Sequence, residues 1–411
     1  MEILDYTISP GNTKGSMNRR RLLMCALSLP ALMARAETPY YPAPDSAGGW
    51  RTRRPGPHVL AKLDAAFERA KESTKHGGLL VAHRGWLVYE RYFGLGSREA
   101  TPNGASCGKA FTSIALGILL GERPDLFPDG LDQKVFTPRY LPEEAFPLDD
   151  PAKADIKLGQ LLAMTAGLAG NNPAYVRGKE VKLTRTGADG WPAMVDRTAL
   201  TTPLWTKPGE GYCYATVAPH IVSIILRRLT GMELQSYLDE KVARPLGWGR
   251  WGFAFQRAEV THTPGGGGIA IRPTDMLRFA YLLLCEGQWA GHQIVPAWYV
   301  HHCGRRSPYN PHYPYSLQFN VNTDGDVAGA PRDAFWKGGS GGHCFYVVPS
   351  LDLVIYKLAG RDEQYKLALT NVPPPPEGLP PYDGSRELWK QPRPEPDATG
   401  DVLRLVAEAF R

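Results

Sequence analysis

Apolar residues recur along the chain with two different periods, and these periods predict where its helices and strands lie. At the start of the ordered pattern, a helical period predicts a helix over residues 57–75. Two short apolar runs follow and predict strands over 78–83 and 86–93. Arg84-Gly85 separates the two runs, so we expect the strands to form a hairpin.

The middle of the chain is mostly helical in pattern. Three periodic apolar segments, each followed closely by a glycine, predict helices over residues 158–165, 217–229 and 274–285. Residues 169–203 carry no clear period. This part of the chain therefore predicts a helical lobe rather than a continuation of the sheet.

The end of the chain returns to strands and then to a helix. Apolar runs predict strands over residues 343–348 and 353–358, and a helical period predicts a last helix over 401–410. The order of elements implies one antiparallel sheet built from the first and last segments, beside a helical lobe from the middle. The predicted fold class is therefore α+β, with the N- and C-terminal helices flanking the sheet.

The first 36 residues have the layout of an export signal. A basic run at Arg19–Arg21 precedes an apolar stretch over residues 22–34, and Ala34-Arg35-Ala36 is a small-x-small cleavage site. The apolar stretch is too short to span a bilayer. The arginine run is also typical of the twin-arginine route. We expect a protein exported to the bacterial periplasm or secreted, with Met17 as the true start; a short amphipathic membrane anchor is the alternative.

Composition divides the rest of the chain. Residues 37–56 are rich in Pro, Gly and Tyr and predict an extended arm, while residues 57–411 predict one large domain. Within that domain, residues 372–398 hold many prolines and predict an irregular excursion. The net charge of +6 falls to +3 without the five basic and two acidic residues of the first 36, and no basic cluster of the kind found in nucleic-acid-binding proteins remains.

Five cysteines follow the predicted cleavage site, and none has the spacing of a zinc site or a redox pair. The odd number leaves at least one free thiol. Export would permit a disulfide, and Cys285 with Cys303 is then the favoured pair. For most of the five, burial as small apolar side chains is the favoured state.

The most informative motif is Ser106-Cys107-Gly108-Lys109, the one Ser-x-x-Lys in the chain. The apolar run over residues 110–120 that follows it predicts a buried helix. Because residues three apart share a helix face, Ser106 and Lys109 should lie side by side. A lysine whose pKa is lowered by burial can take the proton of a serine hydroxyl, and Ser-Lys pairs are a known variant of the serine-nucleophile arrangement. Chance occurrence of so short a motif is the plainer alternative.

The same residues also fit a competing motif. Gly104–Gly108 matches Gly-x-Ser-x-Gly, the nucleophile elbow of α/β-hydrolases, which must follow a strand. Residues 94–103 before it read as a loop. A second match at Gly338–Gly342 leads into a strand rather than a helix. A phosphate-binding loop needs a different glycine spacing and a Ser or Thr after the lysine, so it is excluded.

Two further segments carry candidate chemistry. Tyr214 follows a Pro-Gly turn and precedes the helix predicted over 217–229. An isolated tyrosine in such a place is more often a packed aromatic than a functional group. Lys337 leads into a Gly-rich stretch just before the strand predicted over 343–348, where backbone N–H groups are able to approach a ligand. A solvated loop is the plainer alternative for Lys337.

Together and in this order, these motifs resemble the class C β-lactamase and penicillin-binding-protein family of serine hydrolases. Ser106–Lys109 matches its Ser-x-x-Lys, Tyr214-Ala215-Thr216 its Tyr-x-Asn, and Lys337-Gly338-Gly339 its Lys-Thr-Gly. The resemblance covers roughly residues 57–371 and the last helix. Supporting stretches that also resemble the family are residues 161–168, 208–209, 266–268 and 272–276.

The resemblance implies a β-lactamase/transpeptidase-like fold and a role for each matching residue. Ser106 would attack an acyl carbonyl and form an acyl-enzyme, while Lys109 and Tyr214 would share the acid and base work. The backbone N–H groups of Ser106 and Ser340 would form the oxyanion hole. Lys337, Gly338, Gly339, Ser340 and Thr216 would bind substrate. The resemblance implies a small-molecule or short-peptide acyl substrate and calls for no metal or organic cofactor.

Two departures from the family pattern leave the substrate open. Thr216 stands where the family usually has Asn, and Gly338 replaces a Thr whose hydroxyl could bind a substrate carboxylate. Esterases, D-amino-acid peptidases, amide hydrolases and β-lactamases share this catalytic set, so the fold does not decide among them. An exported serine hydrolase acting on an ester or amide is the leading interpretation. An α/β-hydrolase and a catalytically dead relative that binds peptidoglycan fragments or acyl peptides are the alternatives. The sequence leaves the oligomeric state open.

Overall fold

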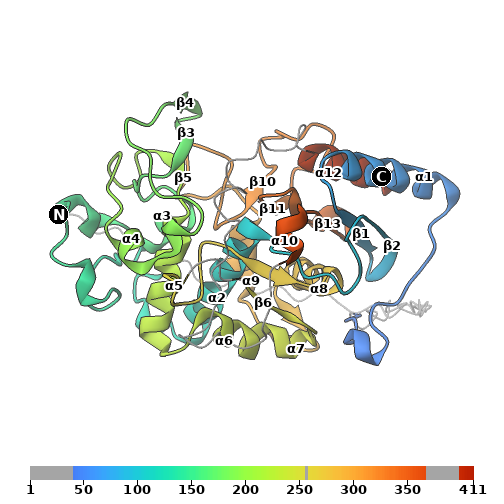
Figure 1. The fold of residues 1–411 in the computed structure, drawn as a ribbon, viewed down its shortest axis with the longest axis horizontal. Helices are drawn as coiled ribbons and strands as arrows, with labels where there is room; N and C mark the ends of the chain where they lie inside the picture. The colour runs from blue at the N-terminus through green and yellow to red at the C-terminus, as the bar shows by residue number, and fades with distance from the viewer. Residues whose placement is uncertain (1–39, 255–257, 367–397) are drawn as a thin grey trace, which may run out of the picture. The chain divides into compact units, whose positions relative to one another are not determined.

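A six-stranded sheet runs through the fold with the strand order β10-β11-β12-β13-β1-β2, and each neighbouring pair in it is antiparallel (Figure 1). The computed structural model describes residues 40–254, 258–366 and 398–411. The strands of this sheet are β1 (Gly77–His83), β2 (Trp86–Phe93), β10 (Asn320–Val321), β11 (Phe335–Gly339), β12 (His343–Val348) and β13 (Leu353–Leu358). The first and last segments of the chain thus form one antiparallel sheet, as predicted.

The β1–β2 hairpin has the predicted turn. Arg84 and Gly85 both have a positive φ, 51° and 70°. Two consecutive residues in this region are typical of a type I′ turn, whose twist matches that of the strands it joins. Glycine adopts this conformation without steric cost, which explains its place in the turn.

Helices cover both faces of the sheet. On one face, α1 (Pro57–Glu72) and α12 (Thr399–Ala409) lie against each other and share a core with apolar residues of β1, β12 and β13 (Figure 1). On the other face lies α8 (Pro273–Leu284), whose Phe279 ring is 5.5 Å from Phe345 of β12 and 3.9 Å from Phe111, centroid to centroid. The N- and C-terminal helices therefore flank the sheet as expected, and the fold is α+β.

The helical lobe is built around α2 (Gly108–Glu122), which is buried over thirteen of its fifteen residues, as its apolar pattern predicts. Next to it, α5 (Val217–Thr230) ends at Gly231, which has a φ of 71° and closes the helix in the left-handed conformation. The other helices are α3 (Leu158–Leu162), α4 (Asp196–Leu200), α6 (Leu234–Leu238), α7 (Arg244–Leu246), α9 (Ala297–Cys303) and α10 (Asp362–Lys366).

Part of the lobe differs from the prediction. The segment without a period contains β3 (Asn171–Val176) and β4 (Lys179–Val181), which form a three-stranded sheet with β5 (Tyr212–Tyr214) in the order β4-β3-β5. These strands are short and mostly half-exposed or exposed, so they show no regular alternation. Helix α3 ends at Leu162 rather than at residue 165 because Met164 adopts a left-handed φ of 58°. The remaining strands are β6 (Trp251–Phe253), β7 (Ile269–Ile271), β8 (Gln288–Trp289) and β9 (His292–Gln293).

Residues 40–56 are less extended than the predicted arm. They contain a 3-10 turn at Asp45–Ala47, and Trp50 is buried against the body of the fold. The predicted export signal (1–36) and all but the last residue of the predicted Pro-rich excursion (372–398) lie outside the described residues. Among the residues that the structure describes, no helix is long and apolar enough to cross a membrane.

The favoured disulfide does not form. All five cysteines in the described part of the chain are free thiols, and four of them are buried. Cys303 lies in the core, while Cys285 is half-buried at the end of α8. Burial as small apolar side chains therefore describes most of them better than cross-linking does.

Candidate active site

Ser106 lies in a 3-10 turn, Ala105–Cys107, that leads directly into α2. Ala105 has a left-handed φ of 47°, and the Asn103 side chain accepts a hydrogen bond from its backbone N–H at 2.9 Å. Backbone strain of this kind is concentrated at functional sites. The turn leaves Ser106 partly exposed at the N-terminal end of a buried helix.

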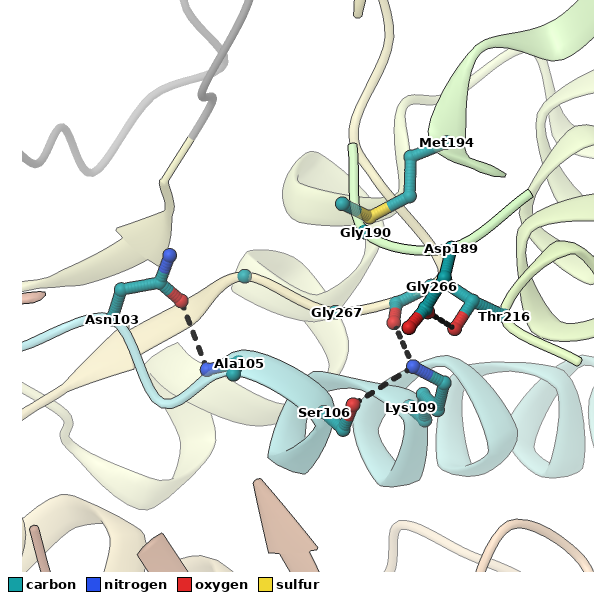
Figure 2. Close-up of a pocket in the computed structure, with 11 residues that line it drawn as sticks. Asn103, Ala105, Ser106, Lys109, Asp189, Gly190, Met194, Thr216, Gly266 and Gly267 are labelled. Atoms are coloured by element: carbon teal, nitrogen blue, oxygen red, sulfur yellow. Dashed lines mark hydrogen bonds between the residues drawn. The ribbon is translucent and has the colours of Figure 1, made fainter. Parts of the chain in front are cut away.

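Lys109 lies one helical turn after Ser106 and points back at it (Figure 2). Its Nζ donates to Ser106 Oγ at 3.0 Å and also to the carbonyl oxygen of Gly266. The side chain is only 1% exposed. Burial lowers the pKa of Lys109 to about 8, although the charge of Asp189 works in the opposite direction. A substantial share of Lys109 is therefore neutral near pH 8 and able to accept the Ser106 proton.

Lys337 is buried next to two tyrosines, which argues against the alternative of a solvated loop. It lies within β11 rather than before a strand, and it is 1% exposed. Its Nζ donates to Tyr315 Oη at 2.6 Å and to Tyr214 Oη at 3.3 Å. Burial, together with the nearby charge of Lys109, lowers the pKa of Lys337 well below its usual range.

Tyr214 ends β5 and lies between the two lysines. Its ring centroid is 5.2 Å from Lys109 Nζ and 4.9 Å from Lys337 Nζ. Tyr214 is half-buried, and its ring meets that of Tyr315 edge-on at 6.3 Å. The structure thus brings Ser106 and Lys109 together with Tyr214 and Lys337, from three segments far apart in the sequence.

A pocket opens beside Ser106 and Lys109 (Figure 2). Thr216, at the start of α5, contributes its buried hydroxyl to the wall and donates to Asp189 Oδ1 at 2.9 Å. The side-chain amide of Asn171 donates to Asp189 Oδ2 at 2.8 Å. The lining residues are Asn103, Ala105, Ser106, Lys109, Asp189, Gly190, Met194, Thr216, Gly266, Gly267 and Gly268.

The glycine stretch of β11 passes close to the turn that carries Ser106. A Cβ atom added to Gly339 would lie 2.1 Å from the carbonyl oxygen of Gly104, so only glycine fits there. Ser340 follows in the exposed turn between β11 and β12. Gln364 of α10 ties the two segments together, because its Nε2 donates to Asn103 O at 2.6 Å and to Ser340 O at 3.1 Å.

Several residues of this site were not identified from the sequence. Asp189 lies in the segment without a period, and Tyr315 and Gln364 belong to no motif. Only contacts between distant segments reveal these three. The sequence did single out Gly266–Gly268, as a run of glycines that resembles the family. In the structure, the carbonyl oxygen of Gly266 accepts a hydrogen bond from Lys109 Nζ.

The alternative nucleophiles fit the structure less well. An α/β-hydrolase elbow follows a strand of a parallel sheet, whereas the residues just before Gly104 form no strand and the main sheet is antiparallel. Cys107 is fully buried, and burial raises the pKa of its thiol to about 12, so it stays protonated at neutral pH. In the part of the chain that the structure describes, no group of three or more His, Cys, Asp or Glu side chains could hold a metal ion.

This arrangement of a serine and two buried lysines on an α+β fold agrees with the comparison to known families. The family model described as Beta-lactamase matches residues 63–371. The chain belongs to the beta-lactamase family. It is thus assigned to a family of serine hydrolases, as the order of its three motifs predicts.

Among individual proteins, Esterase EstB of Burkholderia gladioli is 28% identical to this chain over 256 residues. The match covers 58% of this chain and 62% of EstB, less than two thirds of that relative's length. Two solved structures share the fold. A family VIII carboxylesterase is 18% identical, with a TM-score of 0.55 over 82% of this chain and 99% of that one. The hydrolase EstCE1, titled as having promiscuous acyltransferase activity, is 17% identical, with a TM-score of 0.58 over 75% and 95%.

Proposed function

We propose that this protein hydrolyses carboxylic esters, or amides of similar shape, through an acyl-enzyme on Ser106. The observation that carries the proposal is the 3.0 Å hydrogen bond from the buried Lys109 Nζ to Ser106 Oγ. A serine becomes an effective nucleophile when an adjacent base removes its proton. The similarity to an esterase and to a carboxylesterase favours esters among the possible bonds.

In the proposed reaction, neutral Lys109 takes the Ser106 proton while Oγ attacks the carbonyl carbon. The resulting oxyanion is stabilised by the backbone N–H groups of Ser106 and Ser340, and the leaving alcohol collects its proton from Lys109 or Tyr214. Water then attacks the acyl-enzyme as it gives up a proton to the same groups. The acid leaves, and Ser106 regains its proton.

The proposed role of Lys337 is to orient and polarise Tyr214. Its side-chain nitrogen is buried and donates to Tyr214 and Tyr315, and Lys337 is not one of the residues that line the pocket. This position does not favour the expected role of Lys337 in binding substrate. With Gly338 in place of a hydroxyl-bearing residue, the site supports a neutral ester better than a β-lactam with its carboxylate. Export, which residues 1–36 predict, remains a prediction from the sequence.

The proposal predicts that Ser106→Ala loses turnover of short-chain p-nitrophenyl esters by a factor of at least about a thousand, because no other group in the site forms the acyl-enzyme. Covalent labelling by a fluorophosphonate should disappear in the same variant, and peptide mapping should find the wild-type adduct on Ser106. Cys107→Ala is the matched control and should keep both. A folded wild-type protein that is neither labelled nor active would favour the catalytically dead binder.

A further inference from the structure

Asp189 is an acidic group in the pocket that the proposed reaction does not use. Thr216 Oγ1 and Asn171 Nδ2 donate to its two carboxylate oxygens at 2.9 and 2.8 Å, which fixes their direction. Figure 2 shows the carboxylate pointing toward the same part of the pocket as the Lys109 ammonium. Asp189 is therefore held in place beside the nucleophile.

The carboxylate of Asp189 is ionised at neutral pH. Burial acts to raise its pKa, but the charge of Lys109 and the hydrogen bonds from Asn171, Gly190 and Thr216 outweigh burial and lower it. Lys109 must be neutral when it acts as the base. At that moment Asp189 is the single full charge among the described residues that line the pocket.

Asp189 also retains capacity to bind a ligand. A carboxylate offers about four acceptor positions, and the donors from Thr216, Asn171 and the Gly190 backbone occupy three of them. Asp189 is exposed by its surface area, so solvent and substrate reach it, while the neighbouring atoms partly desolvate its carboxylate. The other buried lysine near the site, Lys337, donates to two tyrosines and is not placed to neutralise a second anion in the pocket.

We propose that Asp189 selects substrates by charge, so that the pocket accepts acyl groups that are neutral or carry an ammonium group and rejects those that carry a carboxylate. An ammonium beside Asp189 replaces the charge that Lys109 gives up, whereas a carboxylate there meets a like charge in a partly desolvated pocket. This inference rests on the proposed ester hydrolysis and adds its substrate class.

Three p-nitrophenyl esters of similar acyl size test the proposal. The cation is 4-(trimethylammonio)butanoate, its neutral isostere is 5,5-dimethylhexanoate, and the anion is the mono-ester of adipic acid. We expect wild-type kcat/KM to favour the cation over the isostere by about tenfold and to disfavour the anion by about the same factor, as for a partly screened ion pair. In Asp189→Asn, which keeps an acceptor for Thr216, both ratios should fall to within about twofold.

Each ratio compares kcat/KM for two esters on the same enzyme, so any effect of the substitution on Lys109 cancels. A change in the ratios therefore measures charge selection alone. Asp129→Asn, which removes an exposed carboxylate beyond the far end of α2, is the control and should keep the wild-type ratios. Ratios that do not change in Asp189→Asn overturn the proposal. A wild-type preference for the adipate mono-ester overturns it without any variant. If none of the three esters is cleaved and Ser106 is not labelled, the proposed hydrolysis itself has failed, which is a different result.

Discussion

At the scale of single residues, the site depends on two lysines whose side-chain nitrogens donate hydrogen bonds to uncharged oxygen atoms. Lys109 donates to a serine hydroxyl and a backbone carbonyl, and Lys337 donates to two phenols. A buried cation is costly when it lacks a full counter-charge, so burial favours the neutral amine in both cases. The fold thereby lowers the pKa of Lys109 into the range that its proposed role as a base requires.

This electrostatic balance predicts the pH dependence of the reaction. Because Lys109 acts in its neutral form and its pKa is lowered to about 8, kcat/KM for a neutral ester should rise with pH and reach half its plateau near pH 8. Below that midpoint, the rate should fall about tenfold per pH unit. The charge of Asp189 raises the pKa of Lys109, so the midpoint should move to lower pH in Asp189→Asn.

The measurement is a pH–rate profile of both enzymes with one uncharged ester whose own hydrolysis is subtracted. Lys109→Ala should lose activity by a factor of about a hundred to ten thousand and lose this rise with pH. A profile that is flat between pH 6 and 9, or a rise that survives in Lys109→Ala, would assign the base to another group.

The pairing of Ser106 with Lys109 was predictable because helix geometry alone puts residues three apart on one face. The environment of Lys337 was not predictable in the same way. Its partner Tyr315 lies in a stretch without a motif, and the contact forms only when β11 packs against the segment that precedes β10. Asp189 reaches the pocket from a loop, so its place depends on long-range packing that no local pattern encodes.

At the scale of elements, the position of the nucleophile depends on how closely β11 approaches the turn that carries it. Gly339 lies against the backbone of Gly104 and Cys107, while a Cβ atom added at Gly338 would make only an ordinary contact, 3.6 Å from His343 O. Close backbone contact therefore requires glycine at position 339, whereas no such contact requires it at position 338. The close approach brings the turn with Ser340 next to Ser106, where the proposed oxyanion hole requires it.

This contrast predicts different outcomes for two adjacent substitutions. In Gly339→Ala, the new Cβ would lie 2.1 Å from Gly104 O and 3.1 Å from Cys107 N, so β11 must move away from Ser106. We expect a loss of about 1–3 kcal/mol in the free energy of unfolding and a large loss of turnover and of fluorophosphonate labelling. In Gly338→Ala, the nearest atom to the new Cβ is 3.6 Å away, so stability and labelling should change little.

Thermal melts and labelling rates of the two variants, compared with wild type, provide the measurement. If Gly339→Ala and Gly338→Ala have the same melting temperature and labelling rate, the close approach of β11 does not hold Ser106 in place. Gly338→Thr extends the series to the hydroxyl-bearing side chain that the family usually has there.

The elements themselves were predictable to different degrees. Strands β2, β12 and β13 begin and end where their apolar runs predict. Every residue of β12 and β13 is buried, so their apolar pattern is continuous, while β2 has its buried residues at alternate positions, Leu87 and Tyr89. By contrast, β3, β4 and β5 are short, and β3 and β4 are largely exposed, so they carry no such pattern. Asp189, which lines the pocket, lies in this same stretch. The sequence therefore predicted neither the strands of this stretch nor its acidic group in the pocket.

At the scale of the whole molecule, the segment before α1 is attached to the fold through a buried charge cluster. Asp45 accepts from Arg278 at 2.6 Å and from Thr274 at 2.7 Å, and Asp275 accepts from both Arg278 and Arg272. The buried part of the cluster therefore holds two arginines and two carboxylates, with Arg278 and Asp275 fully buried, while the exposed Glu99 adds a third carboxylate 3.4 Å from Arg272. The cluster joins residues 40–56 to α8, which covers one face of the main sheet.

Because the charges of this cluster offset one another, removing one of them should lower the free energy of unfolding substantially. Asp45→Asn leaves the two guanidinium groups with one buried carboxylate, Asp275, and the exposed Glu99. Breaking a buried pair typically costs about 3 kcal/mol or more. Asp125→Asn is the matched control, because Asp125 pairs with Arg123 at 2.7 Å but both side chains are more than half exposed. A surface pair of this kind contributes less than about 1 kcal/mol.

Urea unfolding of the two variants and wild type, analysed with a common slope, measures the difference. Because the cluster lies outside the pocket, folded Asp45→Asn should keep the wild-type kcat for a neutral ester at low temperature. If the two substitutions destabilise the protein equally, residues 40–56 are held by apolar contacts such as that of Trp50 and not by charge. If kcat falls along with stability, the segment before α1 also supports the site, through α8 and the strands that it covers.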